Sequence, residues 1–131
     1  MYELLTGHVV RAAGLFVCEQ DRRLAGLVGA SPDGLILDPS GTPIGLIEIK
    51  APTRRLYTAE AAHDIPVGYM CQMQGQMGIT QVATYCDFVT VCFATQELRV
   101  QRVHFCPAYW RTLESQLLKY VPACISHVPQ A

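Results

Sequence analysis

The segment from Gly29 to Pro52, GASPDGLILDPSGTPIGLIEIKAP, constrains the fold of this chain more strongly than any other. It contains two apolar runs, residues 34–38 and 44–50, and each has the length of a strand. The sequence between them, DPSGTP, combines proline, glycine, aspartate and serine, which favour tight turns. We therefore predict that the two runs pair as an antiparallel hairpin.

Chemically active side chains lie at both ends of this hairpin. Asp33 precedes the first strand in the turn-like sequence SPDG, and the second strand ends in Glu48, Ile49 and Lys50. Because side chains alternate along a strand, Glu48 and Lys50 are predicted to share one face, while Ile49 points into the core. Asp33, Glu48 and the backbone carbonyl of Ile49 are a sufficient ligand set for Mg²⁺, which keeps several waters. Lys50 would orient an attacking water or stabilise charge on an attacked phosphate.

Each half of this pattern has a simpler explanation when taken alone. SPDG is a common turn, because proline presets φ and Asp-Gly tolerates the bend that follows. Glu and Lys two residues apart on a strand often form only a solvated ion pair. The combination of both motifs within one hairpin favours a site for phosphodiester hydrolysis.

The rest of the chain predicts an α/β fold in which helices flank a mixed sheet. Residues 2–13 are expected to contain the end of a helix and a turn at Gly7. Short connections between the first strands imply a largely antiparallel meander at the heart of the sheet. Met70, Met73 and Met77 repeat at helical spacing, which predicts a core-facing stripe. Further strands are expected at residues 14–20, 24–31, 81–93 and 97–105, and helices at 59–63, 67–80 and 108–121.

Composition narrows the class of protein. A chain of 131 residues, half of them hydrophobic, is long enough for one domain with a substantial core. The formal net charge of −1 counts against tight DNA binding by this chain alone. The six cysteines form no CxxC pair, which favours reduced thiols packed in the core, in an intracellular, reducing compartment, over a zinc site. No apolar run approaches the roughly 18 residues of a membrane span.

Three motifs, GASPDGL, IEIKAP and IPVGYMCQMQGQM, together resemble the lambda-exonuclease-like (YqaJ-type) viral recombinase family of the PD-(D/E)xK nuclease superfamily. The resemblance implies a restriction-endonuclease-like core and a catalytic metal site at Asp33, Glu48 and Lys50. Tyr69 and Gln72 match the Tyr and Gln of the family's YxxQ motif, which approach the active site. Magnesium is the implied cofactor, and manganese can substitute for it.

The resemblance also implies a function. We expect a metal-dependent exonuclease that digests one strand of duplex DNA, in the 5′→3′ direction, during viral or phage recombination and repair. Its implied partners are double-stranded DNA, further copies of the chain in a trimer, and a single-strand annealing protein. The alternatives are a structure-selective endonuclease on the same scaffold and a catalytically weak DNA-binding or assembly module.

The chain departs from the family pattern at its N-terminus. The family carries a further acidic residue, and upstream of it a basic residue that holds the 5′-phosphate; this chain begins after both, at Tyr2 and Glu3. We therefore interpret residues 1–131 as a single nuclease domain that lacks the N-terminal part of the family domain, and we do not assign Glu3 to the metal site. Arg54 and Arg55 directly follow the EIKAP motif, and we expect them to contact DNA phosphates.

Overall fold

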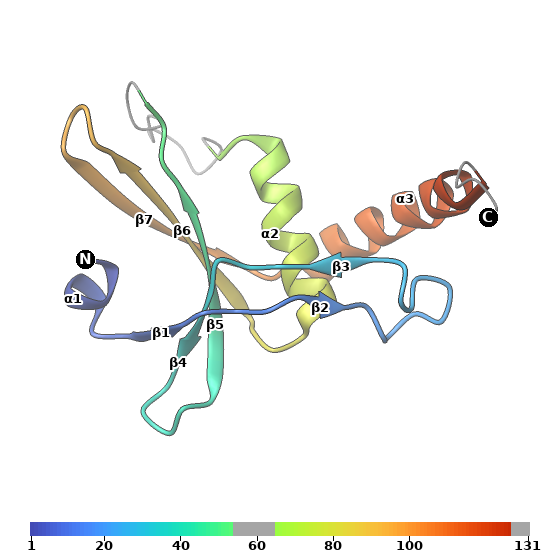
Figure 1. Cartoon of the computed structure of the whole chain (residues 1–131), viewed down its shortest axis with the longest axis horizontal. Helices are drawn as coiled ribbons and strands as arrows, with labels where there is room; N and C mark the ends of the chain where they lie inside the picture. Colours follow the sequence, from blue (N-terminus) through green and yellow to red (C-terminus); the bar gives the residue numbers. More distant parts are fainter. Residues whose placement is uncertain (54–64, 127–131) are drawn as a thin grey trace.

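The computed structural model describes residues 1–53 and 65–126 (Figure 1). Within these residues the chain forms three helices and seven strands. The helices are α1 (Tyr2–Thr6), α2 (Val67–Thr80) and α3 (Pro107–Ser126). The strands are β1 (Val9–Arg11), β2 (Phe16–Val17), β3 (Gly29–Ala30), β4 (Gly34–Leu37), β5 (Pro43–Lys50), β6 (Tyr85–Cys92) and β7 (Glu97–His104).

Five of the described strands form one mixed sheet, in the order β1-β4-β5-β6-β7. The predicted hairpin is confirmed, since β4 and β5 pair antiparallel with Gly34 opposite Ile47. The central strands β5 and β6 are parallel, with Glu48 beside Phe88. A parallel pair requires a crossover connection, and α2 lies within the one that joins β5 to β6. The α/β class with a mixed sheet is therefore confirmed, whereas the expected antiparallel meander is wrong at the centre of the sheet.

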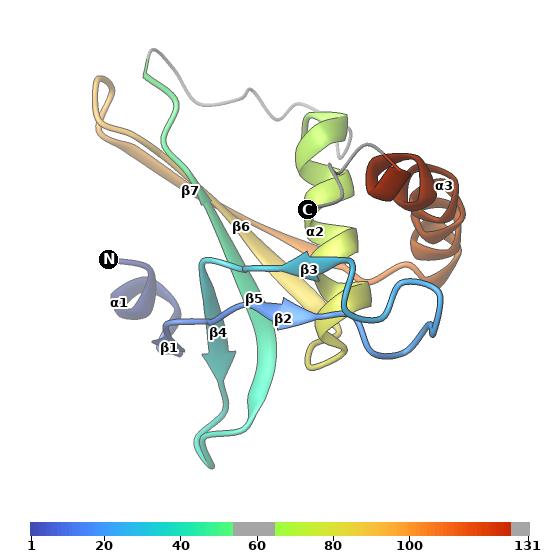
Figure 2. The same ribbon diagram turned by 45° about the vertical axis from the view of Figure 1, so that its right-hand side comes forward.

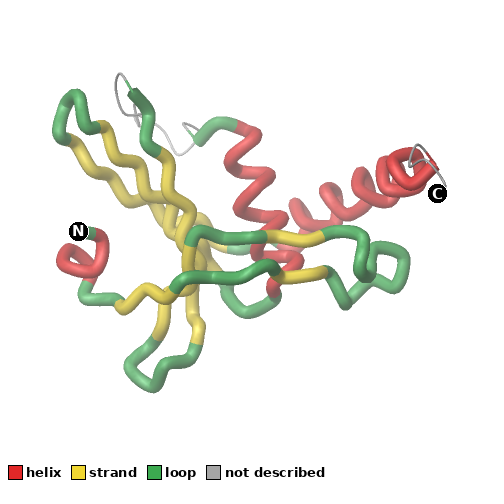
Figure 3. The backbone as a smooth tube through the Cα atoms, in the orientation of Figure 1, coloured by secondary structure: helices red, strands yellow, loops and turns green. Residues whose placement is uncertain are grey.

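The strands β2 and β3 form a separate two-stranded ribbon, which extends beyond the main sheet and passes beside α2 (Figure 3). Both are shorter than the strands predicted at residues 14–20 and 24–31, because only two residues of each strand pair and residues 22–27 form turns. The chain bends between β3 and β4, and Asp33 lies in this bend. The SPDG sequence therefore turns the chain from the ribbon into the main sheet.

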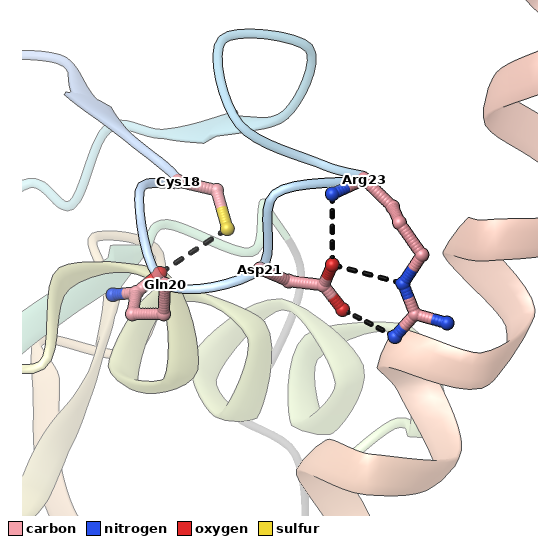
Figure 4. A network of polar contacts seen from close by, with 4 residues as sticks. All are labelled: Cys18, Gln20, Asp21 and Arg23. Atoms are coloured by element: carbon pink, nitrogen blue, oxygen red, sulfur yellow. Dashed lines mark hydrogen bonds and ion pairs between the residues drawn. The ribbon is translucent and has the colours of Figure 1, made fainter.

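Side chains at the far end of this ribbon fix its loop (Figure 4). Asp21 accepts hydrogen bonds from Nε and Nη2 of Arg23, at 3.0 and 2.6 Å. The Cys18 thiol lies 3.1 Å from Oε1 of Gln20, and Nε2 of Gln20 donates to the carbonyl of Ile79 at 2.7 Å. Since Ile79 belongs to α2, these contacts attach the loop to the helix that faces the candidate site.

The two faces of the main sheet are covered differently, and Figures 1 and 2 show α1 and α2 on opposite sides of it. On the α2 face, Met73 and Met77 are buried against Phe88, which confirms the methionine stripe as core. On the other face, Tyr2 of α1 packs into a second cluster with Ile47 and other apolar residues of the sheet. Helix α3 packs on α2 rather than on the sheet, and a Cβ at Gly78 would lie 2.2 Å from the Trp110 ring. Glycine at position 78 therefore permits the close approach of α2 and α3.

Both ends of the described chain differ from the prediction. Residues 2–13 contain α1, but they also contain β1, which the sequence analysis did not predict. Gly7 ends α1 with φ 73°, and a carboxylate oxygen of Glu3 accepts a hydrogen bond from the backbone amide of Val10 at 2.7 Å. Helix α3 continues past the predicted end at residue 121 and includes Pro122, which removes one backbone donor from its last turns.

Over the described part of the chain, none of the helices has the length and apolar character needed to cross a bilayer. The same residues contain no cluster of three or more histidine, cysteine, aspartate or glutamate side chains arranged to hold a metal ion. The cysteines in this part of the chain are unpaired.

Candidate active site

The candidate site is centred on Glu48, which β5 places beneath α2. Its side chain is only 2% exposed and faces α2, on the same face of the sheet as the neighbouring strand's Phe88. An ionised carboxylate at this depth loses most of its hydration and needs charged or polar donors instead. The structure supplies three: Lys50 forms an ion pair with Oε1, Gln72 donates to Oε1 at 2.7 Å, and Gln76 donates to Oε2 at 2.9 Å.

Helix α2 supplies two of these donors because residues four apart lie on one side of a helix. Gln72 and Gln76 are one turn apart, and they contact different oxygens of the Glu48 carboxylate. Gln72 therefore donates directly to the carboxylate of Glu48.

Asp33 approaches the same strand from the bend before β4. Its Oδ2 accepts a hydrogen bond from the backbone amide of Ile49 at 2.7 Å, next to Glu48. The N–H and C=O of one strand residue point to the same edge, so the Ile49 carbonyl is directed toward the side on which Asp33 lies. The prediction that the Ile49 side chain is core is wrong, because it is 47% exposed. β4 pairs with β5 only as far as Ile47, so the last residues of β5 pair with β6 on one edge and with none of the described strands on the edge where Asp33 lies.

Lys50 and Tyr69 form the outer part of the site. Lys50 shares the face of Glu48, as predicted, and its Nζ lies 4.9 Å from the centre of the Tyr69 ring. The face of an aromatic ring attracts a cation, so Tyr69 stabilises the ammonium in this position. Tyr69 itself packs against Phe88, with 5.7 Å between ring centres. The lysine is thus held between a carboxylate and a ring that the core fixes.

The thiol of Cys86 is buried in the core on the α2 side of the sheet. Burial, and then the negative charge of Glu48, raise the pKa of Cys86 well above its usual range. The thiol therefore stays protonated, and it acts as a small apolar group in the α2-side core.

A pocket of about 510 Å³ adjoins the site between β3, α2 and α3. Gln72 and Gln76 belong both to this pocket and to the set of donors around Glu48. Its other walls include Ser31, Trp110 and Leu117. The carboxylate is therefore connected through two amide side chains to a cavity with mainly apolar walls.

Comparison with known proteins places this arrangement in a family. The family model for the YqaJ-like viral recombinase domain matches residues 1–83. The chain belongs to this family. A comparison with curated proteins gives no match.

Solved structures agree with the YqaJ-like assignment. An alkaline exonuclease (LHK-Exo) from Laribacter hongkongensis is 30% identical, with a TM-score of 0.70 over 97% of this chain and 64% of the other. The structure of LHK-Exo in complex with dAMP is 28% identical, with a TM-score of 0.71 and the same coverage, 97% and 64%. The chain thus spans just under two thirds of the length of this exonuclease. A third structure, SSO0001, is 11% identical with a TM-score of 0.56 over 93% of this chain and 53% of the other, and it supports the fold alone.

Most of the residues singled out from the sequence of this YqaJ-like chain lie together. Asp33, Glu48, Lys50, Tyr69 and Gln72 are linked by the contacts described above. The two arginines expected to contact DNA, Arg54 and Arg55, lie outside the described residues.

One contact of the site was not assigned from the sequence. Gln76 shares a helix face with Tyr69 and Gln72 in the sequence pattern, but only Gln72 matches the YxxQ motif. The helical spacing was the signal that could have identified Gln76, since a residue four positions after Gln72 returns to the same side.

Proposed function

We propose that this chain is a metal-dependent DNA exonuclease, which hydrolyses phosphodiester bonds of duplex DNA in the 5′→3′ direction during viral or phage recombination and repair. One observation carries the proposal: a carboxylate that is 2% exposed, Glu48, gathers a lysine and two glutamines beside a second acidic residue. A purely structural ion pair does not require a second carboxylate beside it or neutral amide donors that line a pocket. The alkaline exonuclease that is 30% identical supports the same activity.

The donor set fits a hard divalent cation such as Mg²⁺ or Mn²⁺. The proposed ligands are the carboxylates of Asp33 and Glu48 and the backbone carbonyl of Ile49, all of which are oxygen donors. Gln76 adds a buried amide oxygen without a hydrogen-bond partner, which suits a hydrated ion nearby. When bound, the ion supplies Lewis-acid activation of water and neutralises charge on the phosphate.

The protein residues then have separate proposed roles. Lys50 directs its ammonium at the attacking water or at the phosphate oxygens, where a fixed positive charge stabilises the transition state. Gln72 holds Oε1 of Glu48, and Tyr69 holds Lys50 through its ring. Their combined effect is to fix the charged groups before the substrate arrives, so that little reorganisation is needed.

Two further points concern the substrate and its partners. The related exonuclease binds dAMP, a nucleoside monophosphate, which is the class of product that an exonuclease releases. A net charge of −1 gives this chain little electrostatic attraction for DNA by itself. A closed ring retains DNA without net electrostatic attraction, so we propose that further copies of the chain, in a trimer, enclose the duplex, and that a single-strand annealing protein receives the product strand.

The direct test is digestion of linear, 5′-phosphorylated duplex DNA in Mg²⁺, compared with EDTA and with Lys50→Ala. We expect metal-dependent loss of the duplex that the substitution abolishes. A nicked or supercoiled circular plasmid is the control for an endonuclease, and we expect it to remain intact. A folded protein that leaves linear DNA uncut in both Mg²⁺ and Mn²⁺ would contradict the proposal and favour a DNA-binding or assembly module.

A further inference from the structure

Gln76 of α2 is buried, although glutamine side chains are mostly exposed in proteins. Its side chain is 4% exposed, and its Nε2 donates to Oε2 of Glu48 at 2.9 Å. The orientation of the amide follows from charge: turned the other way, its carbonyl oxygen would face the carboxylate and repel it. The contact therefore fixes both side chains.

The three donors on Glu48 are distributed unevenly between its two oxygens. Within the described part of the chain, Oε1 accepts from Lys50 and Gln72, whereas Oε2 accepts only from Gln76. A carboxylate has about four acceptor positions in total, two on each oxygen. The position that remains is on Oε2, the oxygen that Gln76 holds.

The carbonyl oxygen of the Gln76 amide, Oε1, is an acceptor that needs a hydrogen-bond donor. It is buried and has no hydrogen-bond partner among residues 1–53 and 65–126. Leaving a buried acceptor unpaired destabilises the folded state, so a native structure usually provides a donor for it. Hydration water of an ion at Oε2 of Glu48 would be such a donor, because Mg²⁺ retains several waters when proteins bind it.

We propose that Gln76 is a positioning residue of the metal site: its Nε2 directs the Glu48 carboxylate so that Oε2 binds the cation, and its Oε1 accepts a hydrogen bond from the cation's hydration shell. This inference rests on the proposed function, since it requires a divalent cation at Glu48. It goes beyond that function by adding a residue outside the YxxQ motif.

Gln74 offers a matched control on the same helix. It is 2% exposed, but its Nε2 donates to the His104 carbonyl and its Oε1 accepts from the Cys106 amide, both at 2.9 Å. Both ends of this amide hold the backbone that enters α3, away from Glu48. Gln74→Met should therefore lower stability without changing the affinity for the ion.

The experiment is titration of the full chain with Mn²⁺ alone, followed by calorimetry and by the electron paramagnetic resonance signal of the free ion. For Gln76→Met, which keeps the volume and removes both polar atoms, we expect Mn²⁺ affinity about 10- to 100-fold below that of the wild type. Gln74→Met should keep wild-type affinity. Circular dichroism without metal establishes that each protein is folded, and Gln76→Asn, which keeps an amide that is too short to reach, replaces Gln76→Met if the latter is unfolded.

The outcomes separate the two proposals. Equal Mn²⁺ affinity in wild type and in the folded Gln76 variant would overturn the role of Gln76 and leave the proposed nuclease site intact. An equal loss of affinity in the Gln74 and Gln76 variants would also overturn it, because the effect would then be structural. A wild-type protein that binds no Mn²⁺ would overturn the metal site itself, and with it the inference.

Discussion

Two buried carboxylates lie on adjacent central strands, on opposite faces of the same sheet. Glu48 of β5 is 2% exposed and Asp87 of β6 is 1% exposed. Each is paired with a cation, Lys50 in one case and Arg102 in the other. Burial and an ion pair therefore do not distinguish a functional carboxylate from a structural one in this protein.

The partners of Asp87 are those of a structural brace. Arg102 donates through Nε and Nη2 to its two oxygens at 2.8 and 2.9 Å, a bidentate geometry that fixes the guanidinium. The guanidinium also lies 3.8 Å from the centre of the Tyr85 ring. The hydroxyl of Tyr2 donates to Oδ2 at 2.5 Å and thereby joins α1 to the sheet.

Glu48 differs in the kind of partner rather than in their number. Its cation is a lysine, whose ammonium is not committed to a two-bond geometry as a guanidinium is. Its other donors are neutral amides that line a pocket of about 510 Å³, and a second carboxylate, Asp33, contacts the adjacent residue of the strand. A lysine and neutral amides can give up their contacts with Glu48 more readily than a bidentate arginine can. This arrangement, beside a pocket, is expected where a ligand must reach the carboxylate.

The largest effect is expected from removing the charge of Glu48. Glu48→Gln should lower the rate of duplex digestion by about 10³-fold or more, because a neutral amide lacks the negative charge with which the carboxylate would hold a divalent cation. We expect the melting temperature to fall less than in Asp87→Asn, since the Lys50 ammonium is not held in a two-bond geometry, whereas Asp87 accepts two bonds from Arg102 and one from Tyr2. Digestion rates and thermal unfolding, measured on the same samples, check this; a variant with wild-type activity would show that Glu48 is structural.

The matching substitution on the other face, Asp87→Asn, should lower stability and leave activity unchanged. Asp87→Asn places an amide N–H₂ against donors from Arg102 and Tyr2, and it removes the counter-charge of the guanidinium. We expect unfolding free energy to fall by about 2–3 kcal/mol, at the low end for a broken buried pair because the Arg102 side chain is 41% exposed. Denaturant titration measures this loss. Activity per folded molecule should be unchanged. A loss of activity would show that Asp87, like Glu48, is needed for the reaction.

The hydrogen bond between Tyr2 and Asp87 should also affect how stability depends on pH above pH 10. Burial, together with the hydrogen bond to Asp87, raises the pKa of Tyr2 above its ordinary value of 10.0. A raised pKa in the folded state means that this contribution is complete below about pH 10 and is lost as the pH rises further. Tyr2→Phe should lower stability by about 1–2 kcal/mol at neutral pH. It should also flatten the decline above pH 10, which denaturant titrations from pH 7 to 11 would measure; an unchanged decline would place its origin elsewhere.

The same comparison shows what the sequence can predict. The motifs at Asp33, Glu48, Lys50 and Gln72 are local, and the hairpin and helix that carry them were predicted nearly to the residue, with α2 at 67–80. The parallel pairing of β5 with β6 and the pairing of β1 with β4 depend on partners distant in the chain, and they were not predicted. Asp87, Arg102 and Tyr2 belong to three separate segments without a motif, so their contact follows only from the folded sheet. Gln76 had a local signal, its helical spacing, but its role depends on what lies opposite the helix.

The smallest effect concerns the ring beside Lys50. If Tyr69 acts through its ring, which lies 4.9 Å from the ammonium, Tyr69→Leu should lower the digestion rate about fivefold, the equivalent of about 1 kcal/mol. Tyr69→Phe keeps the ring and its packing against Phe88, so it should change the rate less. Single-turnover digestion at saturating Mg²⁺ separates this effect from changes in metal binding. Equal losses in the two variants would assign the role to the hydroxyl, and Lys50 would then depend on Glu48 alone for its position.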